Sequence, residues 1–274
     1  MKITMLGTGN ALVTECYNTC FAIEDNGKYF LVDGGGGNGI LSQLKKASID
    51  LNNIRDIFVT HKHVDHVMGI IWIVRLICQG MAENTYEGEA NIYTFAELAE
   101  LIKDFASQVL TKKQAAFIDD RLHFVIIDNG ESRNIINHEV IFFDIMSTKA
   151  KQFGFTMNLE TIQGEGSNTG KLTCCGDEPY NEACEKYAIG SKWLMHEAFC
   201  LYNEADVFHQ YEKHHSTVKD ASELAEKLSV ENLILYHTED KNIAIRKEKY
   251  TAEGKEYFSG NIFVPDDLEV ITIV

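Results

Sequence analysis

The chain has 274 residues, a formal net charge of -16 and 45% apolar residues. The apolar share excludes an intrinsically disordered chain, and the negative charge disfavours binding to long polyanions such as nucleic acids. The longest apolar run, residues 69–78, contains Arg75 and is shorter than the roughly 20 residues of a membrane span, so we expect no membrane partner. The N-terminal residues lack signal-peptide features, and the seven cysteines have no regular spacing. These features predict free thiols and a cytoplasmic location.

The first half of the chain alternates strand and helix patterns in order. Short apolar or alternating runs predict strands, and spacings of three and four predict helices. Strands are expected at residues 2–7, 19–24, 29–35 and 54–60, and helices at residues 39–49, 66–77 and 96–110. The strand at residues 54–60 ends directly before a cluster of histidines.

The second half repeats the alternation. Strands are expected at residues 139–146, 153–159, 171–177, 192–198 and 232–240, and helices at residues 181–188 and 216–229. Ser216 is the expected N-cap of the last helix, with Val218, Ala221, Ala225 and Leu228 on its buried face.

The strands form two sets, and helices accompany each set. Two sheets that bury their inner faces and carry helices on their outer faces satisfy this pattern. We therefore predict an α/β (α+β) chain folded as a four-layer αββα sandwich. No linker, repeat or change of composition divides the sequence, so residues 1–274 are interpreted as one domain.

Three histidines and an aspartate lie within six residues directly after a predicted strand, as His61-x-His63-x-Asp65-His66. A turn there can direct His61 and His63 to one metal ion and Asp65 and His66 to a neighbouring one. Imidazole and carboxylate are ligands that suit zinc, and also manganese or iron. Chance would produce the pattern in about one chain in a thousand or fewer, so it predicts a metal site.

The chain resembles metallo-β-lactamase-fold hydrolases of the ribonuclease Z-like branch. The resemblance covers nearly the whole chain and is carried by these motifs in order: GTGNA, LVDGGGG, THKHVDH, GD at Asp177, HEA at His196, HST at His215, and a strand-ending histidine, His237. It implies two divalent ions, with zinc favoured over manganese or iron. It also implies that Asp177 bridges the ions and that His237 completes the second site, giving the ligand set His61, His63, Asp65, His66, Asp177 and His237.

The resemblance also suggests proton-transfer roles. Asp65 would be both a ligand and a general base, and Glu197 and His215 match positions that position or protonate the leaving group. For Glu197 a purely supporting role is the alternative. Cys174 and Cys175 are interpreted as core residues, and Asp33 as an anchor of the glycine turn by hydrogen bonds.

One expected ligand is missing. Where the family has a further histidine for the first metal, this chain has Met146. His138 cannot replace it, because eight residues of extended chain span roughly 26 Å. His123 starts a predicted strand of its own and is no better placed. A thioether is a poor ligand for zinc or manganese, so the first site is expected to be weak or more hydrated.

The sequence therefore predicts a metal-dependent hydrolase of a phosphodiester or related ester, acting on a small-molecule or short nucleotide-like substrate. A thioester, lactone or lactam hydrolase of the same fold is an alternative, because fold alone does not determine substrate. A catalytically weakened metal- or ligand-binding protein, motivated by Met146, is another. A homodimer is compatible with the sequence. Efficient transfer-RNA processing is not expected, because the roughly twenty residues between Thr156 and Asp177 are too few for the long flexible arm of most ribonuclease Z enzymes.

Overall fold

In the computed structural model, which describes residues 1–161 and 170–273, the strands form two seven-stranded sheets. The sheets belong to two compact units. The first comprises Met1–Gly7, Tyr17–Asp128 and Leu268–Ile273, and the second comprises Thr8–Cys16 and Asn129–Asp267. Each unit is described by itself below. The interpretation of residues 1–274 as one domain stays a prediction.

The sheet of the first unit has the order β14-β1-β2-β3-β4-β5-β6. Its strands are β1 (Lys2–Gly7), β2 (Cys20–Asp25), β3 (Lys28–Val32), β4 (Ile54–Phe58), β5 (Ala90–Thr94), β6 (Leu122–Ile126) and β14 (Val270–Thr272). β14, β1, β2 and β3 pair antiparallel, whereas β3 to β6 pair parallel. The carboxyl ends of β3 and β4 consequently lie at the same edge, and they lead into the glycine turn and the histidine cluster.

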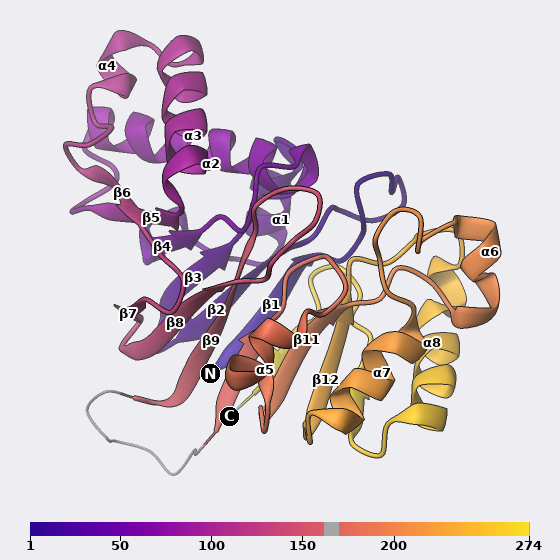
Figure 1. Ribbon diagram of the computed structural model, residues 1–274. Coiled ribbons are helices and arrows are strands. Elements are labelled where there is room, and N and C mark those ends of the chain that lie inside the picture. Colours follow the sequence, from indigo (N-terminus) through magenta and orange to yellow (C-terminus); the bar gives the residue numbers. More distant parts are fainter. Residues whose placement is uncertain (162–169, 274) are drawn as a thin grey trace. The chain divides into compact units, whose positions relative to one another are not determined.

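The helices of this unit are α1 (Gly39–Lys46), the 3-10 turn η1 (Leu51–Asn53), α2 (Val64–Glu83), α3 (Ala96–Val109) and α4 (Lys112–Ala115). α1 contacts β1, and α2 and α3 contact β6 (Figure 1). Among the described residues, α2 alone is long and apolar enough to cross a membrane by length and composition. More than half of the relevant window is buried inside the protein, as in the core helix of a globular unit.

The sheet of the second unit has the order β13-β12-β11-β10-β9-β8-β7. Its strands are β7 (Ser132–Ile135), β8 (His138–Asp144), β9 (Phe153–Thr161), β10 (Lys171–Cys174), β11 (Trp193–Glu197), β12 (Asn232–Tyr236) and β13 (Asn261–Phe263). β10 to β13 pair parallel, and β7 to β10 pair antiparallel. Because β10, β11 and β12 are parallel neighbours, the residues that follow them meet at one edge of the sheet.

The helical segments of the second unit are η2 (Glu182–Cys184), α5 (Glu185–Ala188), η3 (Tyr202–Glu204), α6 (Ala205–Phe208), α7 (Val218–Lys227) and α8 (Ile243–Tyr257). α7 packs on β11, β12 and α8, and α8 also contacts β13 (Figure 1). The apolar face predicted for α7 is confirmed, because all four of its residues are buried in the core of this unit.

Two sequence predictions need correction, and several short elements were missed. The N-cap of α7 is Thr217 and not Ser216: Thr217 and Asp220 form a reciprocal capping box, whereas the backbone N–H of Ser216 donates to Glu197. β8 ends at Asp144, two residues before Met146, which has a left-handed backbone with φ 59°. The short strands β5, β7, β13 and β14 and the helix α8 are not predicted from the sequence, because their patterns are too brief or too mixed in charge to stand out.

Candidate metal centre

The histidine cluster of the first unit lies where the chain passes from β4 into α2. His61 is buried in the connection, and His63 is the N-cap of α2. Asp65 and His66 lie in the first turn of α2 and are buried. The positive end of the helix dipole favours a carboxylate at this position. A rigid strand and a rigid helix thus hold all four predicted ligands of this unit within a six-residue segment.

Asp33 connects the glycine turn after β3 to this cluster. It is 3% exposed and accepts hydrogen bonds from the backbone N–H of Thr60 (2.9 Å) and from Thr60 Oγ1 (2.7 Å). Its second oxygen also lies 2.7 Å from His66 Nδ1. A carboxylate only accepts, so His66 carries its proton on Nδ1 and has its lone pair on Nε2. The predicted anchoring role of Asp33 is confirmed.

His61 is oriented by the same network. Thr60 Oγ1 uses its single proton on Asp33 and lies 2.9 Å from His61 Nδ1, so it accepts from that nitrogen. The lone pair of His61 is consequently on Nε2. Hydrogen bonds that select the tautomer of a metal-binding histidine in this way are a regular feature of metal sites. Thr60 was not singled out in the sequence, although its position next to His61 was a usable signal.

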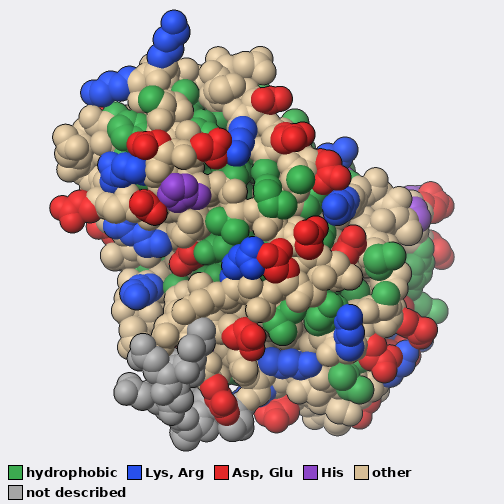
Figure 2. Space-filling model, turned by 60° about the vertical axis from the view of Figure 1, so that its left-hand side comes forward, with side chains coloured by type: hydrophobic (Ala, Val, Ile, Leu, Met, Phe, Trp, Pro, Cys, Tyr) green, Lys and Arg blue, Asp and Glu red, His purple; other side chains and the backbone are tan. Residues whose placement is uncertain are grey.

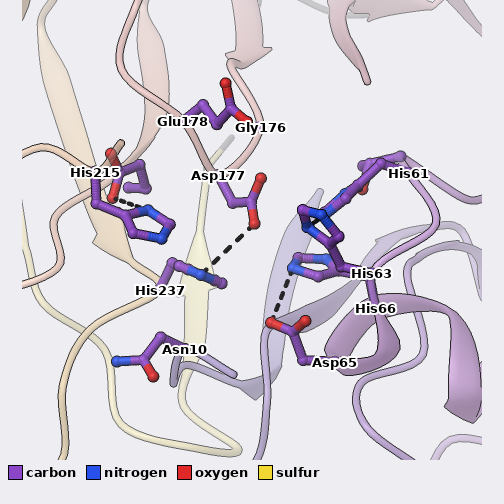
Figure 3. A network of polar contacts seen from close by, with 12 residues as sticks. Asn10, His61, His63, Asp65, His66, Gly176, Asp177, Glu178, His215 and His237 are labelled. Atoms are coloured by element: carbon purple, nitrogen blue, oxygen red, sulfur yellow. Dashed lines mark hydrogen bonds and ion pairs between the residues drawn. The ribbon is translucent and has the colours of Figure 1, made fainter. Parts of the chain in front are cut away.

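The imidazoles of His61 and His63 converge. His61 Nε2 lies 2.8 Å from His63 Nδ1, and the rings of His61 and His66 are 4.3 Å apart. Two such nitrogens need either a shared proton or a cation between them. His66 Nε2 lies 3.4 Å from Asp65 Oδ2 (Figure 3). Imidazole nitrogens and a carboxylate oxygen gathered this closely are a donor set that fits zinc, manganese or iron, and all four residues are metal-ligand candidates by their geometry.

The glycine turn packs directly on α2. A Cβ added to Gly69 would lie 1.8 Å from the carbonyl oxygen of Gly34, and a Cβ added to Gly34 would lie 2.4 Å from the backbone nitrogen of Ile70. Side chains at either position would push α2 away from the turn. These two glycines are therefore explained by helix packing below the histidines.

In the second unit, Asp177 follows β10 and His237 follows β12, the two strands that flank β11. Both are buried, at 4% and 2% exposure, and His237 Nε2 lies 3.6 Å from Asp177 Oδ2 (Figure 3). His237 has a left-handed backbone with φ 58°. A non-glycine residue in this conformation persists only where its surroundings hold it.

The segment that holds His237 is built from the GTGNA motif and α8. The backbone N–H of Thr238 donates to the Thr8 carbonyl (3.0 Å), and both the backbone and the side-chain amide of Asn10 donate to the Thr238 carbonyl. The fully buried Arg246 donates to Thr238 Oγ1 at 2.6 Å. Arg246 lies in a mixed-charge segment, and no local pattern marks it as a buried residue.

Glu197 and His215 also meet in the second unit. Glu197 ends β11 and is fully buried, and its Oε2 lies 3.4 Å from His215 Nδ1. The other oxygen of Glu197 accepts from the backbone N–H of Ser216. The ring of His215 stacks on Phe199 at 5.1 Å and lies 5.3 Å from the ring of His237. The sequence placed these two residues in one site, and the second unit does bring them together.

The remaining predictions concern Met146 and the cysteines. Met146 is 53% exposed, and its backbone N–H donates to Asp144 Oδ1 at 2.8 Å. Its relation to a first metal stays a prediction. Cys174 and Cys175 are buried, and Cys175 belongs to the apolar core. Burial raises the pKa of the Cys175 thiol well above its ordinary value, so it is a neutral thiol and packs as a core residue.

Comparisons with known proteins identify the family of the chain. A family model described as "Anti-Pycsar protein Apyc1" matches residues 1–255. The chain is 24% identical to Ribonuclease Z of Thermococcus sibiricus, with 100% of the chain and 96% of that protein covered. It is also 24% identical to Ribonuclease Z of Bacillus thuringiensis (strain Al Hakam), with 97% of each covered.

Solved structures show the fold. The metallo-β-lactamase fold protein YhfI from Bacillus subtilis superposes with a TM-score of 0.75 at 14% identity, with 99% of each chain covered. Human tRNase Z, short form, superposes with a TM-score of 0.73 at 20% identity, with 100% of each chain covered. A diphosphatase of the PhnP family gives 0.73 at 16% identity over 98% of this chain and 96% of that one. The predicted metallo-β-lactamase fold is confirmed.

Proposed function

Because the chain belongs to the anti-Pycsar protein Apyc1 family and is a ribonuclease Z-like hydrolase of the metallo-β-lactamase fold, we propose that it hydrolyses a phosphodiester. The proposed substrate is a small molecule or short nucleotide, and the proposed cofactors are two divalent cations. The observation that carries the proposal is the cluster after β4. There the Nδ1 atoms of His61 and His66 are hydrogen-bonded to Thr60 and Asp33, so each ring has its lone pair on Nε2, where it can bind a cation. The names ribonuclease and diphosphatase among the relatives also favour cleavage at phosphorus.

The proposed ligand sets follow the family resemblance. His61 and His63 would hold the first cation, Asp65, His66 and His237 would hold the second, and Asp177 would serve both. Zinc is the favoured ion, with manganese or iron as alternatives. When bound, such a pair of cations supplies Lewis-acid polarisation of the phosphoryl group and lowers the pKa of a water molecule.

Three side chains are proposed to manage protons. Asp65 accepts a proton from the attacking water as the new P–O bond forms. His215 delivers a proton to the oxygen that leaves as the other P–O bond breaks. Glu197 keeps His215 in the orientation that this transfer needs, because its buried carboxylate faces Nδ1 at 3.4 Å. His215 Nε2 is then the nitrogen that faces the leaving oxygen.

The first cation is proposed to have one protein ligand fewer than in the family. Met146 has a thioether in place of the expected imidazole, and a thioether contributes little binding to zinc or manganese. The backbone N–H of Met146 donates to Asp144 Oδ1 at 2.8 Å, which fixes the backbone of this turn. A first site that is weaker or more hydrated than the second follows.

Long RNA is not the proposed substrate. The net charge of -16 opposes steering of a polyanion. On the face in Figure 2, the basic side chains of the described residues are scattered among acidic ones and form no continuous track. The segment that the sequence predicts to be too short for a transfer-RNA arm includes residues 162–169, which lie outside the described residues. Efficient cleavage of a precursor transfer RNA at physiological salt would contradict this part of the proposal.

The test combines metal analysis with a substrate panel. Purified protein should contain zinc, manganese or iron, and it should hydrolyse bis(p-nitrophenyl) phosphate, a dinucleotide or a cyclic mononucleotide. Turnover of only thioesters, lactones or lactams would favour the alternative hydrolase. Bound metal without any turnover would favour a weakened binding protein.

A matched pair of variants tests the metal assignment. Asp177→Ala should lower the occupancy of both cations, because a bridging carboxylate serves each of them. Asp104→Ala removes an exposed carboxylate from α3 and should leave the metal content unchanged. Loss of one equivalent only in Asp177→Ala would show that Asp177 is not a bridge.

A further inference from the structure

The loop between β8 and β9 is tightly built although much of it is exposed. The buried carboxylate of Glu178 accepts from Ser147 Oγ at 2.8 Å and from the backbone N–H of Thr148 at 3.2 Å. Ser147 Oγ in turn accepts from the backbone N–H groups of Lys149 and Ala150, each at 3.2 Å. The buried side chain of Glu178, which follows Asp177 in the sequence, therefore fixes the backbone that carries Lys149.

Lys149 reaches the catalytic pair of this unit. Its Nζ lies 3.4 Å from Nε2 of His215, the nitrogen opposite the one that faces Glu197. In the part of the chain that the structure describes, Lys149 forms no ion pair with a carboxylate. A second cation lies nearby, because Lys213 Nζ is 5.4 Å from the centre of the Phe199 ring, which stacks on His215. Two lysines thus lie around His215 in a chain whose net charge is -16.

A lysine held in this position suits an anionic group. An ammonium is a compact point charge with three donors and is a regular ligand of phosphate oxygens. The imidazole nitrogen of His215 does not neutralise the charge of the Lys149 ammonium. A phosphoryl oxygen placed beside His215 Nε2 would replace this weak contact with a charge-assisted hydrogen bond.

We propose that Lys149 binds a non-bridging phosphoryl oxygen of the substrate beside His215, and that it selects anionic phosphodiesters over neutral esters. This inference rests on the proposed function. It adds Lys149 as the residue that makes substrate binding depend on the negative charge of the substrate. Lys149 takes no part in proton transfer. Its removal should therefore weaken substrate binding and leave the chemical step nearly unchanged.

The chain offers a matched control in Lys151, which lies in the same loop and has its Nζ 5.8 Å from the centre of the Phe153 ring. Lys149→Ala and Lys151→Ala change the net charge equally, so long-range field effects affect both. For an anionic diester, Lys149→Ala should raise KM about tenfold, as expected for a charge-assisted contact that solvent partly screens. Its kcat should change less than about twofold. Lys149→Arg, which keeps the charge, should recover most of the loss.

Two readouts separate this inference from the proposed function. If the wild type hydrolyses diesters and the two alanine variants have equal KM values, Lys149 makes no specific contact and the inference is wrong. If the wild type hydrolyses no diester, the proposed function fails. Calorimetric titration with inorganic phosphate then decides the role of Lys149. Binding about tenfold weaker in Lys149→Ala than in Lys151→Ala supports it, and equal binding overturns it.

Discussion

Asp33→Asn tests whether the glycine turn controls metal binding through the tautomer of His66. The substitution keeps the size of the side chain and leaves one oxygen to accept from the Thr60 N–H. The other oxygen, which faces Thr60 Oγ1 and His66 Nδ1 at 2.7 Å each, becomes an amide donor. Both contacts can re-form only with reversed polarity, so His66 Nδ1 would accept and Nε2 would carry the proton. A protonated Nε2 cannot bind a metal.

The magnitude follows from the number of hydrogen bonds that change. Two charge-assisted contacts become neutral ones, at about 1 kcal/mol each, so the free energy of unfolding should fall by about 2 kcal/mol. Returning His66 to the metal-binding tautomer breaks its new hydrogen bond. This costs about 1–3 kcal/mol, or roughly five- to 150-fold in metal affinity, in line with the roughly 10- to 100-fold losses seen when the partner of a ligating histidine is removed.

The assay is a zinc titration by calorimetry, paired with nitrogen-15 NMR of the histidine rings to identify the tautomer. Asp56→Asn is the control, because Asp56 also accepts side-chain hydrogen bonds in the first unit, from Tyr93 (2.9 Å) and Asn91 (3.4 Å), away from the histidines. The control should bind zinc as the wild type does. If Asp33→Asn binds zinc with unchanged affinity and His66 keeps its proton on Nδ1, the tautomer argument is refuted.

Three further predictions follow from other parts of the chain. Met146→His restores an imidazole at the missing ligand position, so it should raise the zinc affinity of the first site and the phosphodiesterase activity. Unchanged zinc affinity and an unchanged rate would mean that Met146 does not face the metal. Thr217→Ala removes the N-cap of α7 and should lower the free energy of unfolding by about 1 kcal/mol, or Tm by roughly 2–4 °C, whereas Thr217→Ser should retain most of the stability in the same thermal melt. Burial, and secondarily the charge of Asp267, raises the pKa of Cys16 to about 11. Only about one molecule in a thousand is then thiolate at pH 8, so the alkylation rate at Cys16, followed by peptide mass spectrometry, should rise about tenfold per pH unit from 8 to 10, and a plateau below pH 9 would contradict this pKa.

Local patterns in the sequence were sufficient for most of the framework. The regular strands and helices around the site follow from the alternation of apolar residues, because burying one face of a strand or helix demands that alternation. The cluster from His61 to His66 could be recognised in the sequence because its candidate ligands lie within six consecutive residues. The same reasoning placed Val218 and Ala221 on the buried face of α7, and the structure confirms both.

Other features depended on residues that are distant in the sequence and were settled only by the tertiary structure. Asp33, which follows β3, selects the tautomer of His66 in α2. Arg246 supports the segment after His237 from a helix with no apolar stripe. The backbone N–H of Ser216 donates to Glu197, nineteen residues earlier. Sequence periodicity reports which face of an element is buried, but a buried polar side chain is positioned by its hydrogen-bond partners. Those partners come together only when parallel neighbouring strands bring their ends to one edge of a sheet.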